Sequence, residues 1–462
     1  MERKNVWTKY TKPQLKKLNE FSDAYIDFLS SCKTERECVK RIVADCEKEG
    51  YMDLNECISK GKKLKAGDKV YAVNRGKGII LFTIGKNPLE TGMNILGAHI
   101  DSPRLDIKQN PLYEADGFAY LDTHYYGGIK KYQWVTIPLA LHGVVVKKDG
   151  TKVEINIGED EKDPVFFISD LLVHLSEKQL QKKGALVIEG EDLDLIVGNQ
   201  PLNTKDEDKK EVVKSNVLEL LKERYGIDEE DFISAEIEAV PAGRAREAGF
   251  DRSMILSYGQ DDRVCAFSSY KAMFEVKNPR KTACCILVDK EEIGSVGATG
   301  MQSKFFENTL AELMALTGEY DDLKLRRCLS ASKMLSSDVS SAFDPSYAAS
   351  FDKKNVAYFG RGLVLNKFTG ARGKSGSNDA DAEYLAEIRN IFAKEDIDFQ
   401  TAELGRVDLG GGGTIAYITA LYGMNVIDCG VPVLNMHAPY EASSKADLFE
   451  VKRGYVAFLK NM

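Results

Sequence analysis

Long hydrophobic runs are absent from this chain of 462 residues. No apolar stretch approaches the roughly 18 residues that a membrane-spanning helix needs, so the sequence predicts no membrane association. The N-terminal sequence MERKNVWTKYTKPQLKK contains no apolar core of a secretory signal, and we therefore expect a cytoplasmic protein.

Paired cysteines and excess basic charge are also missing. The nine cysteines are an odd number, they form no CxxC pair, and two of them, Cys284 and Cys285, lie in an apolar segment. This pattern predicts reduced structural cysteines rather than a disulfide framework or a thiolate zinc site. The net charge of -8, with both signs interspersed, excludes the basic surface that nucleic-acid binding requires.

The length and the texture of the chain predict two domains. A chain of 462 residues exceeds one ordinary core, and 43% hydrophobic with 29% charged residues is typical of a globular protein. Strands alternate with helices over 1–103 and 251–462, which predicts an α/β domain with a mostly parallel central sheet covered on both faces, in three layers. Residues 104–250 are richer in period-2 stretches and predict an inserted, strand-rich domain.

Several local elements follow from the same patterns. We expect helices at 14–33, 39–46, 168–180, 212–225, 264–274, 305–316 and 378–392, the last capped by Asn378 or Asp379. We expect strands at 69–73, 78–84, 94–98, 134–141, 143–146, 235–240, 284–288, 335–338, 356–359 and 425–429. The charge-dense segment 203–210 predicts an exposed loop.

The segment 287–301, LVDKEEIGSVGATGM, is the most informative stretch. An apolar strand ends there in Asp289-Lys290-Glu291-Glu292, followed by a glycine-rich segment. Adjacent carboxylates at the end of a buried strand repel each other, and cations would make that arrangement tolerable. Taken alone, the same residues fit a solvated acidic turn equally well.

Polar groups follow other strands in the same way. His99, Glu291-Glu292, Asp338 and His437 all fall at predicted carboxyl ends of strands, which is where α/β sheets bind ligands. The chain has only five histidines, and His99 and His437 both follow apolar strands. A histidine in that position is more often a hydrogen-bonded core residue than a ligand, but the convergence of carboxylates reverses the balance.

The donor types favour two zinc-like ions. Two imidazoles and three carboxylates suit a pair of cations about 3.5–4 Å apart that share a bridging carboxylate. We predict Asp261 as the bridge, His99 with Asp338 on one ion, and Glu292 with His437 on the other. Three carboxylates against two dications leave one positive charge, which favours deprotonation of a bridging water.

Two further carboxylates have predicted roles beside the metals. Glu291 follows the strand next to a ligand and would act as the general base that takes the proton of the water and passes it to a leaving amine. Asp101 lies two residues beyond His99 and would accept the other N–H of that imidazole. Asp101 also fits a simple turn residue before Ser102-Pro103.

These residues lie in motifs that resemble those of the aspartyl aminopeptidase and aminopeptidase I family of dizinc exopeptidases. The motifs occur in order over residues 97–437: Gly97-Ala98-His99-Ile100-Asp101-Ser102-Pro103, Asp261-Asp262-Arg263, Asp289-Lys290-Glu291-Glu292-Ile293-Gly294-Ser295, Ser336-Ser337-Asp338 and Asn435-Met436-His437. The resemblance implies a zinc-exopeptidase catalytic domain that is interrupted by a dimerisation domain.

The resemblance also implies the activity and the assembly. It implies a metalloaminopeptidase that releases N-terminal residues from short peptides, with two zinc ions per subunit and cobalt or manganese as substitutes. The zinc ligands would be the five donors above, with Glu291 as base and Asp101 in support. A histidine of the inserted domain would reach the site of a neighbouring subunit, and the segment Ile168–Leu175 indicates His174, although a locally packed histidine also fits. Family members form dimer-based homo-oligomers, usually tetrahedral dodecamers.

The segment 366–377 departs from the pattern of acid-preferring members. Lys367, Arg372 and Lys374 could bind an acidic side chain or a product carboxylate, or they could be solvated loop charges. A preference for acidic or for neutral and apolar N-terminal residues therefore stays open. Two other functions also stay open: a dizinc carboxypeptidase or deacylase, and a metal-free paralogue that acts as a scaffold.

Overall fold

The computed structural model describes residues 4–205, 209–370 and 372–462. Its contacts divide the chain into two compact units. The major unit comprises Met1–Asp101, Ala245–Met436 and Glu441–Met462, and the inserted unit comprises Ser102–Arg244 with His437–Tyr440. The sequence predicts an inserted domain over residues 104–250, and the inserted unit of the structure begins at Ser102 and its main segment ends at Arg244.

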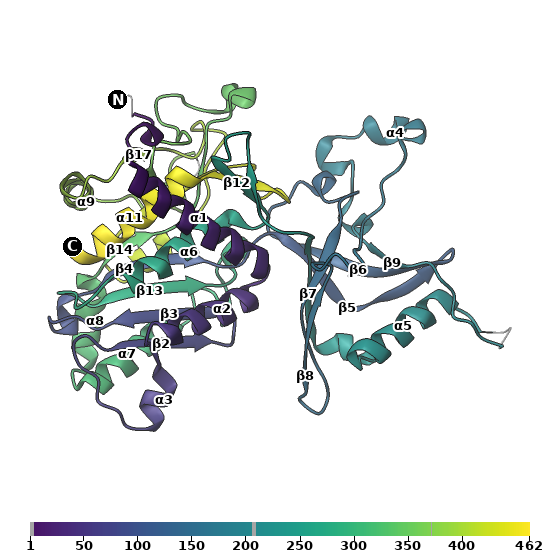
Figure 1. Ribbon diagram of the computed structural model, residues 1–462, viewed down its shortest axis with the longest axis horizontal. Helices are drawn as coiled ribbons and strands as arrows, with labels where there is room; N and C mark the ends of the chain where they lie inside the picture. Colours follow the sequence, from purple (N-terminus) through teal and green to yellow (C-terminus); the bar gives the residue numbers. More distant parts are fainter. Residues whose placement is uncertain (1–3, 206–208, 371) are drawn as a thin grey trace. The chain divides into compact units, whose positions relative to one another are not determined.

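A mixed β-sheet forms the centre of the major unit. Within the described residues its nine strands lie in the order β1 (Met52–Asp53), β2 (Lys69–Asn74), β3 (Gly78–Thr83), β13 (Ala283–Val288), β4 (Asn94–His99), β14 (Lys333–Ser336), β18 (Asn425–Gly430), β16 (Leu363–Asn366) and β17 (Phe399–Thr401). The middle strands β13, β4, β14 and β18 are parallel, whereas β3 and β16 run antiparallel to their inner neighbours. Figure 1 shows β4, β13, β3 and β2 side by side in this order.

Both faces of this sheet are buried by helices. Along β13, Ala283, Cys285 and Leu287 enter one hydrophobic cluster, and Cys284, Ile286 and Val288 enter another. This explains why the strand is apolar at every position, since a strand covered on both faces has no solvated side.

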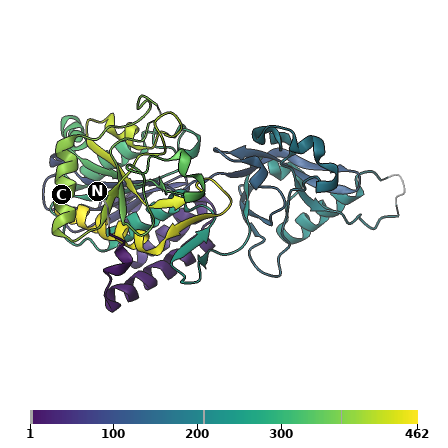
Figure 2. The same ribbon diagram turned by 90° about the horizontal axis from the view of Figure 1, so that it is seen from above.

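The helices divide between the two clusters. The first cluster includes residues of α1 (Lys12–Ser31), α2 (Glu35–Lys48), α6 (Gln260–Phe274), α9 (Ala382–Lys394) and α11 (Lys445–Asn461). The second includes residues of α3 (Leu54–Ser59), α7 (Phe305–Thr317), α8 (Asp322–Ala331) and α10 (Ala416–Ala420). Figure 2 shows the purple N-terminal helix and the yellow C-terminal segments within the same unit.

A smaller sheet completes the major unit. Its strands are, in spatial order, β11 (Arg246–Ala248), β12 (Met254–Ser257), β20 (Glu441–Ser444), β19 (Pro432–Leu434) and β15 (Ser340–Ser341). Strands β12 and β20 are antiparallel neighbours; β12 directly precedes α6 in the sequence, and residues of both strands hydrogen-bond to Gln260 and Asp261 at its start.

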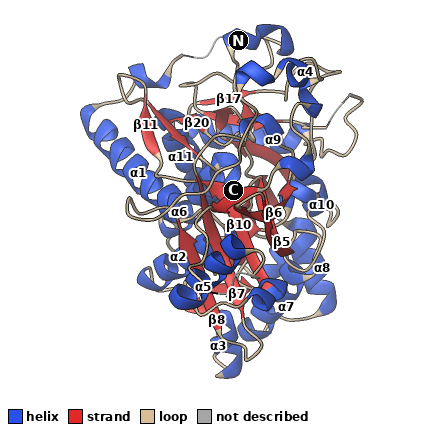
Figure 3. Cartoon of the chain, turned by 90° about the vertical axis from the view of Figure 1, so that its right-hand side faces the viewer, coloured by secondary structure: helices blue, strands red, loops and turns tan. Residues whose placement is uncertain are grey.

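The inserted unit is built on an antiparallel sheet. Its strands are β8 (Lys152–Ile157), β7 (Leu139–Val146), β10 (Ala235–Pro241), β5 (Arg104–Ala115), β6 (Phe118–Tyr126) and β9 (Leu195–Gly198), in that order. Helix α5 (Val212–Tyr225) contacts β5, β6 and β9, and the short helix α4 (Glu177–Leu180) lies in the connection that leads to β9. Figure 3 shows α5 beside the red strands of this unit.

The helix predicted at 168–180 is wrong. Residues 168–172 are irregular, and only a single 3-10 turn at Val173–Leu175 and the short α4 follow. The Asp170 side chain accepts a hydrogen bond from the Leu171 N–H, a local bond that competes with a helix. The apolar side chains after it are exposed, so no packing within the unit supports a longer helix.

Four other local predictions need correction. Strand β7 begins at Leu139 rather than at Trp134. The strand predicted at 356–359 is a single bridge of Ala357, because the next N–H, that of Tyr358, bonds the Gln400 side chain. Helix α9 begins at Ala382 with Asp381 as its cap residue, and the β14 strand ends at Ser336. The loop predicted at 203–210 includes residues 206–208, which lie outside the described residues, and its other residues are exposed and irregular.

All nine cysteines are buried and free, as the prediction of reduced structural cysteines requires. Within the described ranges, no helix combines the length and the apolar character needed to cross a bilayer.

Candidate active site

Three parallel strands carry polar residues to one edge of the central sheet. In β4 and β13, His99 is the register partner of Val288, and in β4 and β14, Gly97 is the partner of Ser336. Because these strands are parallel, their carboxyl ends lie together, and the chain delivers His99, Glu291 and Asp338 from three separate segments to that edge.

His99 is the most enclosed of these donors, with 2% of its surface exposed. Its Nε2 atom lies 3.2 Å from Asp261 Oδ1, 3.9 Å from Glu291 Oε2 and 4.0 Å from Asp338 Oδ1. One ligand atom each of His99, Asp261 and Asp338 lies within 4.8 Å of the other two. The predicted first ligand set therefore comes together in space.

Asp261 reaches this place through the irregular first residues of α6. Asp261 and Asp262 have non-helical backbone angles before the helix becomes regular. The Asp261 N–H donates to Glu441 Oε2 at 3.0 Å, and the preceding Gln260 Nε2 donates to the Glu441 carbonyl. Glu441 is buried and thus orients the bridging candidate, a role that we did not predict. The only feature of the sequence that could have indicated this role of Glu441 is its position, four residues after His437.

Asp101 holds the Glu291-Glu292 pair. Lys290 has a left-handed φ of 67°, so the chain turns at once from β13 into a 3-10 turn, Glu291–Ile293. The fully buried Asp101 carboxylate accepts the N–H groups of Glu291 and Glu292, at 3.2 Å each. His99 Nδ1 lies 3.0 Å from the Asp101 carbonyl oxygen and 3.3 Å from its carboxylate. The main-chain oxygen is thus the nearer acceptor for the imidazole.

The other two predicted ligands belong to different units. Glu292 lies in the major unit, where its N–H bonds the Asp101 carboxylate, and His437 lies in the inserted unit. His437 Nδ1 donates to the Gly128 carbonyl at 2.8 Å, and since a carbonyl only accepts, Nε2 carries the lone pair that a metal ligand needs. His437 has a left-handed φ of 64°, a strained conformation of the kind that clusters at functional sites.

Burial and mutual repulsion disfavour the ionised carboxylates of this cluster. Burial raises the pKa of Asp338 well above its ordinary range, and the neighbouring carboxylates Asp262, Glu291 and Asp261 raise it further. Burial opposes protonation of His99, but its hydrogen bonds with Asp101 and Asp261 outweigh that effect and raise its pKa. Acidic groups this close are not stable as anions unless a cation neutralises them.

The donor set fits zinc. Imidazole nitrogens and carboxylate oxygens are ligands that zinc accepts, and thiolates, which would indicate a closed structural site, take no part in the group of His99, Asp261 and Asp338. Glu291 lies outside this group, and its carboxylate lies beside His99 with 14% of the side chain exposed, so it can meet a solvent molecule there.

Other predicted residues lie elsewhere in their units. His174 is exposed on the turn Val173–Leu175 of the inserted unit. Lys367 and Lys374 both bond Asp379, at 2.7 and 2.8 Å, and Lys374 also lies 3.9 Å from the centre of the Phe368 ring. Asp262, fully buried next to Asp261, belongs to a predicted motif, but we had assigned it no role.

Comparisons with known proteins point in the same direction. The family model described as "Aminopeptidase I zinc metalloprotease (M18)" matches residues 28–459. A protein of Clostridium acetobutylicum named "Probable M18 family aminopeptidase 1" is 63% identical over 460 residues, covering 100% of this chain and 98% of its own.

Solved structures are similar over the whole chain. The crystal structure of aminopeptidase I from Clostridium acetobutylicum has a TM-score of 0.93 at 61% identity, and that of the M18 aminopeptidase from Thermotoga maritima has 0.94 at 46%; each comparison covers 100% of both chains. The S. cerevisiae mApe1 dodecamer shares the fold, with a TM-score of 0.76 at 19% identity over 96% of this chain and 97% of its own.

Proposed function

This chain belongs to the M18 family of aminopeptidase I zinc metalloproteases and is a zinc aminopeptidase, and we propose that it holds two zinc ions on His99, Asp261, Glu292, Asp338 and His437. The observation that carries the proposal is the group of His99, Asp261 and Asp338, whose ligand atoms lie within 4.8 Å of one another, with the Glu292 N–H bonded to Asp101 in the same unit. His99 and Asp338 would hold one ion, Glu292 and His437 the other, with Asp261 between them. The major unit would then be the three-layer zinc-exopeptidase domain.

The ions, when bound, supply Lewis acidity that polarises a scissile carbonyl and acidifies a nearby water. Glu291 would act as the general base, because its Oε2 lies 3.9 Å from His99 Nε2 and so faces the donor cluster. It would take a proton from that water and return it to the leaving amine. Asp101 would act as a positioning residue, since its carboxylate holds the N–H groups of both glutamates.

We further propose that the enzyme works as a dimer-based homo-oligomer, with the inserted unit as the dimerisation domain. The turn that carries His174 supports this idea, because Val173 and Leu175 beside it are 71% and 66% exposed. Apolar side chains this exposed are typical of surfaces that a partner covers. His174 would reach the site of the partner and donate a hydrogen bond to the developing oxyanion. The dodecamer of the yeast relative is the assembly that we expect.

Substrate choice is the least constrained part of the proposal. Lys367 and Lys374 already share Asp379, so less of their charge is available for an acidic substrate side chain. We therefore propose short peptides with neutral or apolar N-terminal residues as substrates, and keep the two lysines as candidates for the product carboxylate.

A panel of single-residue amides tests this function. The zinc-loaded enzyme, and samples loaded with cobalt or manganese, should cleave free-amine substrates and leave their N-acetylated twins intact. Cleavage of the blocked twins would instead indicate a deacylase or carboxypeptidase. A protein that retains no zinc on metal analysis after loading, and that cleaves none of the substrates, would indicate a scaffold.

A further inference from the structure

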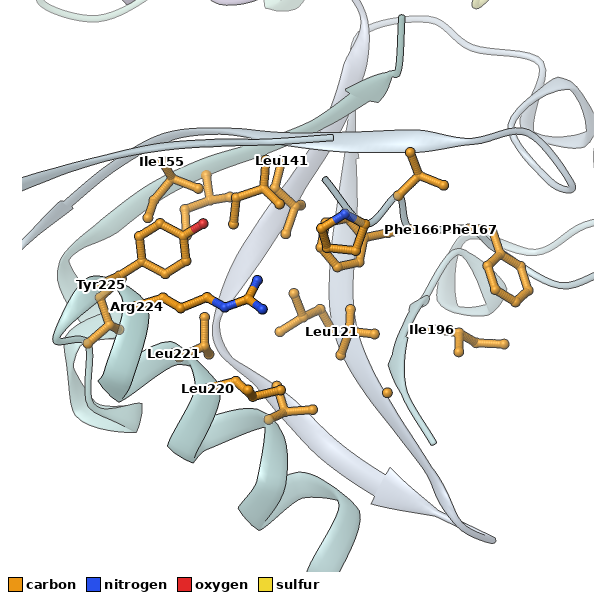
Figure 4. A pocket seen from close by; sticks show the side chains of 18 of the residues that line it. Leu121, Leu141, Ile155, Phe166, Phe167, Ile196, Leu220, Leu221, Arg224 and Tyr225 are labelled. Carbon is orange, nitrogen blue, oxygen red and sulfur yellow. The ribbon is translucent and has the colours of Figure 1, made fainter. Parts of the chain in front are cut away.

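The inserted unit contains a large apolar cavity between its sheet and α5. The cavity has a volume of about 530 Å³, within the range of pockets that hold small molecules. Figure 4 shows side chains from the strands, among them Leu121, Leu141 and Ile155, on one side, and Leu220 and Leu221 of α5 on the other. The whole lining belongs to the inserted unit, and we refer to this space as the α5 cavity.

The cavity results from how α5 is seated on the sheet. Near its start, Val217 lies so close to Gly198 of β9 that a Cβ at Gly198 would meet it at 2.7 Å. Beyond its end, Ile227 and Phe232 are buried again, at 2% and 4% exposure. The helix is thus fixed at both ends, while its last turns line an apolar space that their side chains do not fill. Such a space loses dispersion contacts unless something occupies it.

One cation is directed into this space. Figure 4 shows the Arg224 side chain reaching from α5 into the cavity, with its guanidinium between the apolar walls. Within the described residues, Arg224 has no carboxylate partner, whereas Lys222 on the same turn is paired with Asp228. A guanidinium offers a planar fork of donors that matches a carboxylate.

The mouth of the cavity is apolar as well. Phe118, Val165 and Phe167 line it and are 39%, 49% and 45% exposed. A deep apolar space with a single cation at its side has the chemistry of a site for an anionic amphiphile.

We propose that the α5 cavity binds a small amphipathic carboxylate of the fatty-acid type, with its chain among the apolar walls and its carboxylate on Arg224. Apolar burial then supplies most of the affinity, and Arg224 selects the charged head group. This site is separate from the donor cluster of the aminopeptidase centre in the sequence, since it uses none of the proposed zinc ligands, and it does not depend on the proposed mechanism.

Calorimetric titration of the full-length, zinc-loaded enzyme with octanoate, decanoate and dodecanoate, below their micellar concentrations, tests the proposal. We expect saturable binding of one molecule per subunit, with affinity rising about fourfold for each added methylene until the cavity is full. Decan-1-ol serves as the uncharged counterpart of decanoate.

Three variants make the test specific. Arg224→Gln should weaken decanoate binding by roughly fivefold, a modest effect because the arginine is exposed, and leave decan-1-ol unchanged. Lys222→Gln, which removes a charge from the same turn outside the lining, should change neither. Leu121→Trp, which takes up part of the apolar space from the sheet side, should weaken the binding of both ligands.

Three results would overturn the proposal. The first is the absence of saturable binding by the wild-type enzyme. The second is equal decanoate affinity in the wild type and Arg224→Gln. The third is a Leu121→Trp enzyme that binds both ligands as tightly as the wild type, or that fails to assemble, because loss of assembly would identify a second copy of the chain as the occupant. Circular dichroism of each variant establishes that it is folded.

Discussion

Replacing Asp101 with asparagine should weaken zinc binding without removing a zinc ligand. The Asp101 carboxylate accepts two main-chain N–H groups, from Glu291 and Glu292, at 3.2 Å each. Hydrogen bonds to a charged group contribute about 1.5–3 kcal/mol, and these are longer than the usual charge-assisted bond, so the lower value applies to each. An asparagine side chain has one acceptor oxygen, so it can accept one of the two N–H groups. Its NH2 group faces the other N–H, and two donors cannot bond each other.

The expected loss is therefore about 1.5 kcal/mol for the missing bond, which corresponds to about tenfold in zinc affinity. The loss of zinc affinity should stay near that lower limit, because the substitution leaves the Asp101 carbonyl oxygen 3.0 Å from His99 Nδ1. The tautomer of this zinc ligand is therefore retained. The value of kcat should fall about tenfold or more, because the Glu291 backbone is no longer held in place.

Competition with a chelator of known affinity measures the zinc affinity, and amide hydrolysis at saturating zinc measures kcat. Asp447→Asn is the matched control: Asp447 is also fully buried and accepts two main-chain N–H groups, those of Gly360 and Gly362, at 2.7 Å. It should keep the wild-type zinc affinity. If Asp101→Asn kept the wild-type zinc affinity and kcat, the positioning role of Asp101 would be refuted.

Three further predictions concern the base, the partner histidine and a buried acid. Glu291→Gln should retain both metals and lower kcat at least roughly 10²-fold, measured by metal analysis and peptide hydrolysis; near-wild-type turnover would remove Glu291 from the role of base. His174→Phe should be inactive alone yet regain activity when co-assembled with Glu291→Gln subunits, whereas no rescue in verified mixed oligomers would mean that each site is built by one chain. Burial raises the pKa of Asp447 to about 7 from 3.8. The folded state therefore holds this proton more tightly, and Asp447 should cost stability as the pH rises from about 4 to 7, by up to about 4 kcal/mol. In denaturant titrations the stability of the wild type relative to Asp447→Asn should fall across that window, and a constant difference would contradict this assignment.

The parallel strands were predictable because a short apolar segment that alternates with helices indicates a strand buried on both faces. Each of β4, β13 and β18 has an apolar centre and is buried at nearly every position, as a strand covered on both faces must be, and each leads to a polar residue or turn. From that pattern follows the edge at which His99 and Asp338 meet, which Asp261 joins from the start of α6. The family membership was predictable because the motifs occur in order along the chain, most of them at strand ends.

The sequence did not reveal what depends on contacts between distant segments. The helix predicted at 168–180 failed because its apolar residues face outward rather than onto their own sheet. The role of Glu441 depends on a hydrogen bond to Asp261 across 180 residues, and no local pattern carries such information. The carboxylate of Asp101 accepts the N–H groups of Glu291 and Glu292, about 190 residues further along the chain, while its carbonyl oxygen lies nearest to the His99 imidazole. No local sequence pattern predicts these two separate roles.

The central claim is that His99, Asp261, Glu292, Asp338 and His437 hold a pair of zinc ions on which peptide cleavage depends. Stepwise return of zinc to the chelator-stripped enzyme, with hydrolysis of a free-amine substrate followed at each addition, tests it most directly. The account predicts no cleavage without metal and full activity at two zinc ions per subunit. Undiminished cleavage by enzyme whose measured metal content is negligible would contradict it.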